Sequence, residues 1–153
     1  MALRNIFFEG NPILQKKCRK VEKFDKSLEI LIDDMFETMK HSNGVGLAAP
    51  QVGILKRVAV INVGDGNIEL VNPVVVAFSG EQREEEGCLS CPGQYGITLR
   101  PKFVKVKAQD RFGNEVFHTG QMLKARAFCH EIDHLDGILF KSHIIEQNKY
   151  PPA

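Results

Sequence analysis

Apolar residues recur at intervals of three and four positions between residues 25 and 41. Because this spacing places side chains on one face of a helix, it predicts an amphipathic helix that packs on a core. Asn43 and Gly44 follow, and residues of these types commonly end helices. The preceding residues 1–23 mix apolar and basic side chains and predict an extended N-terminal arm. The apolar face comprises Leu28, Leu31, Ile32, Met35, Phe36 and Met39.

Later segments are rich in β-branched residues or alternate apolar and charged positions, as strands do. Gly64-Asp65-Gly66-Asn67 predicts a hairpin turn, and residues 110–114 predict a second turn. Residues 44–53 are rich in Gly, Ala and Pro and predict a loop. The expected strands cover residues 57–63, 68–77, 103–109 and 115–118.

Helix-forming residues return between Gly120 and Leu135, and Gly137 is placed to end this second helix. Strands followed by one late helix predict an α+β fold rather than a doubly wound sheet. We therefore expect antiparallel sheets packed around this central helix, with one additional N-terminal helix. A chain of 153 residues suits a single domain spanning 1–153. The tail over residues 146–153, with Pro151-Pro152, is expected to be frayed.

Charge and hydropathy narrow the possible partners. The formal net charge is +1 and charges of both signs are mixed along the chain, so no nucleic-acid site is indicated. No apolar run reaches the roughly 18–20 residues of a membrane span, and the N-terminus lacks the apolar segment of a secretory signal. We expect a cytoplasmic protein. The acidic cluster at residues 81–86 is interpreted as a solvated strand edge.

The second predicted helix contains the motif H-E-x-x-H, formed by His130, Glu131 and His134. Because positions i and i+4 share one face of a helix, both imidazoles can reach one metal ion. Glu131 lies where its carboxylate can take a proton from metal-bound water without ligating the ion. The alternative is a pair of histidines on a solvated face. The neighbouring residues favour the metal site because they are apolar: Phe128, Ile132, Leu135, Ile138 and Leu139.

Two histidines leave a tetrahedral site one protein ligand short. A third His at the common downstream spacing would fall at Phe140, and Asp136 and Glu146 are poorly placed. An upstream thiolate is the alternative, and Glu86-Gly87-Cys88-Leu89-Ser90 is the attractive place for it. There the glycine permits close backbone approach, and Leu89 offers a backbone N–H to an oxyanion.

The remaining cysteines leave other interpretations open. Cys88 and Cys91 have the spacing C-x-x-C, so a structural zinc site or a redox pair is an alternative to the hydrolase site. Cys18, Cys91 and Cys129 are otherwise interpreted as ordinary buried thiols.

The segment Gly44-Val45-Gly46-Leu47-Ala48-Ala49-Pro50-Gln51 lacks the Lys and Ser or Thr of a phosphate-binding loop. Its small residues would let an extended peptide approach as an added strand, with Gln51 supplying an amide donor. The alternative is a tight connection in which small residues serve packing.

Together, this glycine-rich segment, the cysteine motif and the H-E-x-x-H motif resemble three motifs of the peptide deformylase family, in the family's order and over nearly the whole chain. The family usually has Gln before the first His, where Cys129 stands, but that position is not a ligand. The chain ends soon after the third motif, so we expect the long C-terminal helix of some members to be absent or reduced.

The resemblance implies removal of the N-formyl group from formyl-methionyl peptides emerging from the ribosome, with release of formate. It also implies Cys88 as the third ligand and Fe(II) as the native metal, which Zn, Ni or Co can replace. Ligand types alone would indicate zinc. In the expected mechanism Glu131 takes the proton of the attacking water and passes it to the leaving amine. The metal, the Leu89 N–H and the Gln51 amide would hold the oxyanion.

Helix geometry indicates which residues of the second predicted helix line the pocket for the methionine side chain of the substrate. Positions three, four and seven residues before His130 lie on the metal-facing side of the helix. We expect Arg126 to extend to the pocket rim, and Leu123 has core packing as its alternative role. Tyr95 and Arg100 are candidate peptide contacts. The residues expected to line the pocket are Val45, Gly46, Leu123 and Ala127.

Three other functions compete with this one. A zinc endopeptidase would need a third His or Glu, which the spacing does not supply. A non-catalytic metal-binding module would not need Glu131, Gln51 and Cys88 together. A thiol-redox protein would use Cys88 and Cys91.

Overall fold

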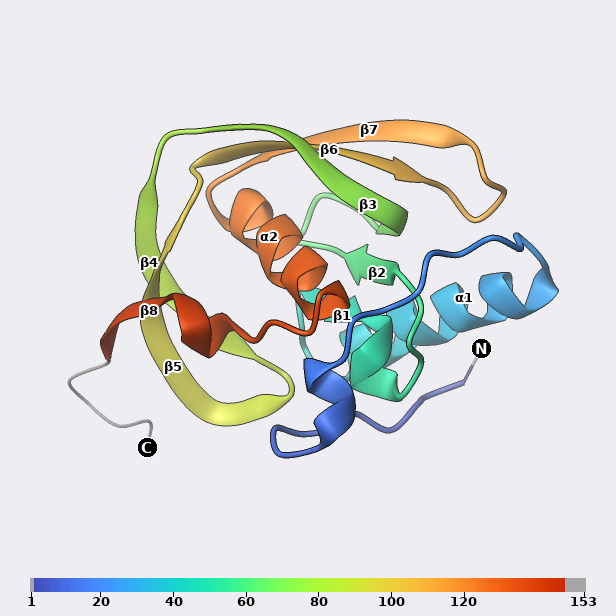
Figure 1. The fold of residues 1–153 in the computed structure, drawn as a ribbon, viewed down its shortest axis with the longest axis horizontal. Helices are drawn as coiled ribbons and strands as arrows, with labels where there is room; N and C mark the ends of the chain where they lie inside the picture. The colour runs from blue at the N-terminus through green and yellow to red at the C-terminus, as the bar shows by residue number, and fades with distance from the viewer. Residues whose placement is uncertain (1, 148–153) are drawn as a thin grey trace.

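The computed structural model describes residues 2–147 as two antiparallel sheets, two α-helices and three short 3-10 helices (Figure 1). The elements are, in order, η1 (Pro12–Gln15), α1 (Lys26–His41), β1 (Gly46–Ala48), η2 (Ala49–Val52), β2 (Val58–Ile61), β3 (Ile68–Ser79), β4 (Gln82–Cys88), β5 (Cys91–Arg100), β6 (Phe103–Gln109), β7 (Glu115–Gln121), α2 (Leu123–Leu135), η3 (Phe140–His143) and β8 (Ile144–Gln147).

The two sheets enclose α2. The larger has the strand order β1-β2-β3-β6-β7, and the smaller has the order β4-β5-β8. Figure 1 shows α2 near the centre, with the larger sheet over one side and β4, β5 and β8 curving around another. This arrangement confirms the predicted α+β fold of antiparallel sheets around a central helix with one additional N-terminal helix.

Strand β2 is buried on both faces, because a helix packs on each side of the sheet. Val58 and Val60 belong to the core formed with α1, whereas Ala59 and Ile61 belong to the core formed with α2. All four are fully buried. The uninterrupted apolar sequence of this strand therefore follows from its central position, since a strand with one solvated face would alternate.

Helix α2 approaches the sheet through small and aromatic residues. Ala125, Ala127 and Phe128 are buried in the core that α2 shares with β2, β3 and β6. The alanines allow close approach of the helix, and the phenylalanine ring fills the space beside them. The position of His130 and His134 therefore depends on how this face of α2 is packed.

Two predicted element boundaries were wrong because strand pairing extends into these segments. Helix α2 begins at Leu123 rather than at Gly120, because Gly120 and Gln121 pair with Val104 and Phe103 as the end of β7. Residues 44–53 are not only a loop, since β1 pairs with β2 and η2 follows it. These hydrogen bonds come from distant segments, which local propensity does not report.

The two ends of the chain also refine the prediction. The N-terminal arm is largely extended but contains the turn η1, and Cys18 N–H donates to Leu135 O at 2.8 Å. Of the tail predicted to be frayed, Glu146 and Gln147 lie in β8. Residues 148–153 lie outside the described residues.

Replacing Phe128 with Ala should lower the free energy of unfolding by about 3–5 kcal/mol, because a fully buried ring is lost and a cavity remains. Urea denaturation measures this change. Phe112→Ala is the matched control, because Phe112 is 66% exposed and should lose far less. Equal losses in the two variants would contradict the packing described for α2.

Candidate metal centre and active site

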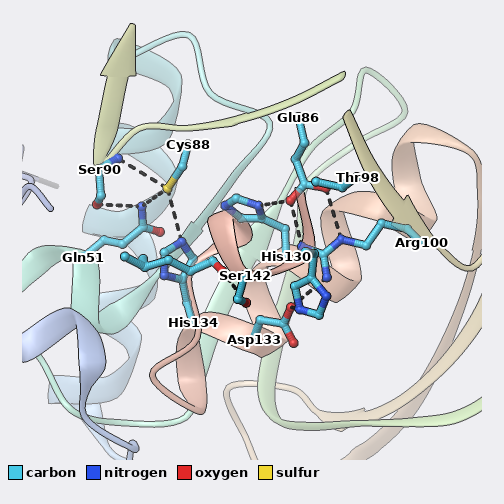
Figure 2. A network of polar contacts seen from close by, with 12 residues as sticks. Gln51, Glu86, Cys88, Ser90, Thr98, Arg100, His130, Asp133, His134 and Ser142 are labelled. Atoms are coloured by element: carbon cyan, nitrogen blue, oxygen red, sulfur yellow. Dashed lines mark hydrogen bonds and ion pairs between the residues drawn. The ribbon is translucent and has the colours of Figure 1, made fainter. Parts of the chain in front are cut away.

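Three ligand-type side chains from two elements converge beside α2. Cys88 stands at the end of β4, and His130 and His134 lie one turn apart on α2. One ligand atom from each residue lies within 4.8 Å of the other two. The Sγ of Cys88 is 3.3 Å from Nε2 of His134 (Figure 2). One thiolate and two imidazoles are a donor set for a transition metal rather than for Mg²⁺ or Ca²⁺, which prefer oxygen.

The imidazole of His130 is oriented by a buried carboxylate. Its Nδ1 lies 2.6 Å from Oε2 of Glu86, and both side chains are more than nine-tenths buried. A proton on Nδ1 that is donated to Glu86 leaves the lone pair of Nε2 free for a metal. Carboxylate–histidine pairs of this kind fix the tautomer and the ring orientation of metal ligands.

Glu86 is in turn held by two neighbours on β5. Arg100 donates from Nε and Nη2 to the two carboxylate oxygens at 3.1 and 2.8 Å, and Thr98 Oγ1 donates at 2.8 Å. Arg100 Nη1 also donates to Asp133 at 2.7 Å, so the Arg100–Asp133 ion pair connects β5 to α2 (Figure 2). Burial by itself raises the pKa of Glu86, but the hydrogen bonds from His130 and Arg100 outweigh burial and lower the pKa to about 2. The carboxylate is therefore ionised at neutral pH.

Glu131 borders the same site, and one of its carboxylate oxygens lacks a hydrogen-bond partner within residues 2–147. It is 4% exposed, and its Oε1 has no hydrogen bond among the described residues. Burial raises its pKa to about 7, and although His130 opposes this shift, the charge of Glu86 adds to it. Gly46 on β1 lies directly against this carboxylate, because a Cβ there would clash with Oε2. A side chain at position 46 would therefore displace the Glu131 carboxylate.

Gln51 lies at the end of the cavity nearest Cys88. Its Oε1 accepts from the Ala48 N–H at 2.9 Å, which fixes the amide so that Nε2 faces the cysteine turn. Nε2 donates to Ser90 Oγ at 3.0 Å and is 3.6 Å from Cys88 Sγ. Leu89 borders the cavity from the same turn. The proposed donation by the Leu89 N–H stays a prediction.

A cavity of about 460 Å³ opens beside these groups. All four residues predicted to line the methionine pocket border it, together with Glu131, Gln51 and Cys88. Leu123 is 39% exposed, so the cavity wall rather than the closed core accounts for its position. Arg126 and Tyr95 also border the cavity, although Arg126 additionally donates to Gln82 Oε1 at 3.0 Å.

Two residues depart from the interpretation of the sequence. The acidic cluster is exposed at Glu84 and Glu85 on the edge strand β4, as expected, but Glu86 is 6% exposed and bonded to His130. Arg100 was a candidate peptide contact, yet it is 4% exposed and fully engaged with Glu86 and Asp133. The period of two along a strand was an available signal, because it places Glu86 on the same face as Cys88.

Glu86→Gln should weaken metal binding by roughly 10–100-fold, because the amide no longer accepts a charge-assisted hydrogen bond from His130. Competition between the metal-free protein and a chromophoric chelator for Zn²⁺ measures the affinity. Glu84→Gln on the same strand is the control, since Glu84 is exposed. Equal affinity of the two folded variants would show that Glu86 does not position the ligand.

Comparisons with known proteins agree with this geometry. The sequence matches the polypeptide deformylase family over residues 3–150. The peptide deformylase of Caldicellulosiruptor bescii is 57% identical over 145 residues, which are 95% of this chain and 87% of that protein. That of Alkaliphilus metalliredigens is 54% identical over 147 residues, which are 96% of this chain and 100% of that protein.

Solved structures give the same result. A peptide deformylase from Legionella pneumophila has a TM-score of 0.91 and 46% identity, over 94% of this chain and 86% of that one. The enzyme from Thermotoga maritima has a TM-score of 0.91 and 41% identity, over 94% and 99% of the two chains. The chain therefore belongs to the polypeptide deformylase family and is an enzyme.

Proposed function

We propose that this protein removes the N-formyl group from the formyl-methionine end of newly made polypeptides, releasing formate and a free amine. The observation that carries the proposal is the placement of Glu131, Gln51, Cys88 and His130 around one cavity, with His134 completing the ligand cluster. Family membership supports the same reaction.

The side chains present fit a resident divalent metal. The ligand atoms of Cys88, His130 and His134 converge, and Glu86 already occupies Nδ1 of His130. We propose Fe(II) as the native ion, with Zn, Ni or Co able to replace it, on the basis of the family resemblance. When bound, the ion supplies a Lewis acid that lowers the pKa of a water molecule and polarises a carbonyl.

Glu131 is proposed to move the proton. Its carboxylate is buried, lacks a hydrogen-bond partner at Oε1 and borders the cavity. It accepts a proton from the water that attacks the formyl carbon and then donates it to the amine nitrogen as the C–N bond breaks. One carboxylate thus serves as base and then as acid, and it ends the cycle in its starting state.

Gln51 and Leu89 are proposed to stabilise the developing negative charge on the formyl oxygen. The Gln51 amide is preorganised, because Ala48 holds its oxygen and leaves its NH₂ facing the cysteine turn. The second donor is the backbone N–H of Leu89. Donors that are fixed before the reaction cost no reorganisation when the charge forms.

The methionine side chain is proposed to lie in the apolar part of the cavity. Val45 and Leu123 are 41% and 39% exposed there, and Gly46 and Ala127 leave room between them. An unbranched thioether fits such a partly open, irregular apolar surface.

The remaining expectations extend this proposal to the setting of the protein. We propose one catalytic domain over 1–153, nascent peptides at the ribosome as substrates, a cytoplasmic location and no nucleic-acid site. Neither helix among the described residues is long and apolar enough to span a bilayer.

Glu131→Ala should retain the metal but lower turnover by about 10²–10⁴-fold, since proton transfer is lost. Formate release from formyl-Met-Ala-Ser, with metal analysis of the same anaerobic sample, measures both quantities. Glu84→Ala is a surface control, and Glu131→Gln preserves side-chain size. Normal turnover of the metal-loaded Glu131→Ala protein would refute the role. Cleavage of internal peptide bonds without formate release by the wild type would instead favour an endopeptidase.

Leu123→Ala should raise KM for formyl-Met-Ala-Ser by about tenfold, because about 1–3 kcal/mol of apolar contact with the methionine is lost. KM for formyl-Gly-Ala-Ser, which lacks that side chain, should change little. Leu99→Ala is the matched control, since Leu99 is 37% exposed and does not border the cavity. An equal effect on both substrates would place the methionine elsewhere.

A further inference from the structure

The proposed metal ligand Cys88 faces a second cysteine across a tight turn. Strands β4 and β5 are antiparallel, and Cys88 pairs with Cys91 beyond a register shift that follows Gly87, with only the turn residues Leu89 and Ser90 between them. The first and last residues of such a four-residue turn have Cα atoms less than about 7 Å apart. That separation overlaps the roughly 4.4–6.8 Å range that a disulfide spans.

The two thiols are in contact but differ in access. The side chains of Cys88 and Cys91 interact directly, and both are free thiols. Cys88 borders the cavity, whereas Cys91 is 1% exposed and does not border it. A small molecule that enters the cavity therefore meets Cys88 first, and Cys91 lies behind it.

Neither the proposed metal site nor the other cysteines give Cys91 a role. Among the described residues it is not in the ligand cluster, which contains Cys88 and the two histidines. Cys18 and Cys129 border the core beside α2. The cysteine that pairs with Cys91 is thus the proposed ligand.

The turn that joins the two cysteines is held in place from outside. Glu9 N–H donates to Ser90 O at 2.8 Å, and the Glu9 carboxylate accepts from Lys141 at 2.7 Å and Gln94 at 3.2 Å. The same carboxylate contacts the Cys91 thiol. These contacts hold in place the turn that carries both sulfur atoms.

We propose that Cys88 and Cys91 form a reversible disulfide with hydrogen peroxide as oxidant, which withdraws the sulfur ligand and releases the metal. The inference rests on the proposed metal site, because its effect on the ion requires Cys88 to be a ligand. Cys91 acts as the resolving cysteine that intercepts the oxidised form of Cys88.

The reaction balances in two steps. Peroxide transfers one oxygen atom to the Cys88 sulfur, giving a sulfenic acid and one water. The Cys91 sulfur then attacks the Cys88 sulfur, the S–O bond breaks, and the hydroxide leaves with the Cys91 proton as a second water. The two sulfur atoms lose two electrons in total, which reduce the peroxide. A dithiol reductant reverses the change, whereas further oxidation to sulfinic acid would not be reversible in this way.

The zinc-loaded wild-type protein and the zinc-loaded Cys91→Ala variant should give different products when they are treated with hydrogen peroxide. In the wild type, mass spectrometry should show a Cys88–Cys91 disulfide and the loss of two hydrogens, with zinc released to a chromophoric chelator. Dithiothreitol should restore one zinc per chain. In Cys91→Ala, Cys88 should gain two or three oxygen atoms, and dithiothreitol should restore little zinc binding.

Two further variants keep the test decisive. Cys91→Ser preserves size and polarity should the alanine variant fail to fold, and Cys129→Ala should behave as the wild type. Overoxidation of Cys88 in the wild type as rapid as in Cys91→Ala, or a disulfide that maps to another cysteine, would overturn the proposal. Formate release by the reduced, metal-loaded protein is assayed separately, so failure of the proposed activity is distinguishable from failure of the switch.

Discussion

The hydrogen bond between Glu86 and His130 joins the two halves of the site. It links the strand that carries Cys88 to the helix that carries both histidines, so it fixes the distance between the sulfur and nitrogen ligands. A carboxylate this deeply buried is costly unless it is fully paired. Arg100 and Thr98 complete the pairing, and Arg100 extends it to Asp133 on the same helix.

A second constraint is space. Strand β1 comes so close to α2 that a side chain at position 46 would displace the Glu131 carboxylate. Ala48 on β1 and Ala127 on α2 continue this pattern of small buried residues. The polar groups of the site are therefore enclosed by packed backbone, where electrostatic interactions are stronger than in water.

The parts of the site are held in different ways. The histidines and Glu86 are fixed by helix packing and a buried ion pair, whereas Cys88 stands at the end of a strand beside a two-residue turn. A substitution of Cys91 would therefore change the surroundings of Cys88 while leaving α2 and its two histidines unchanged. Under the proposed switch, the redox response of the site depends on the residue at position 91.

The sequence by itself determined the elements whose pattern is local. Helix α1 was expected over 25–41 and spans Lys26–His41, and β6 was expected over 103–109 and spans Phe103–Gln109. The motif spacing also determined which residues could serve as ligands and as proton carrier, because i and i+4 share a helix face. The resemblance of the sequence to the three deformylase motifs agrees with the family that the comparisons show.

Only the tertiary structure decided the roles that depend on residues far apart in the chain. The roles of Glu86 and Arg100 were predicted wrongly because their partners lie on other elements. A sequence does not distinguish a buried, paired charge from an exposed one. The start of α2 shifted for the same reason, since Gly120 found a strand partner in β6. The spacing of Cys88 and Cys91 had allowed a redox pair, but only the pairing of β4 with β5 placed Cys91 opposite the proposed ligand.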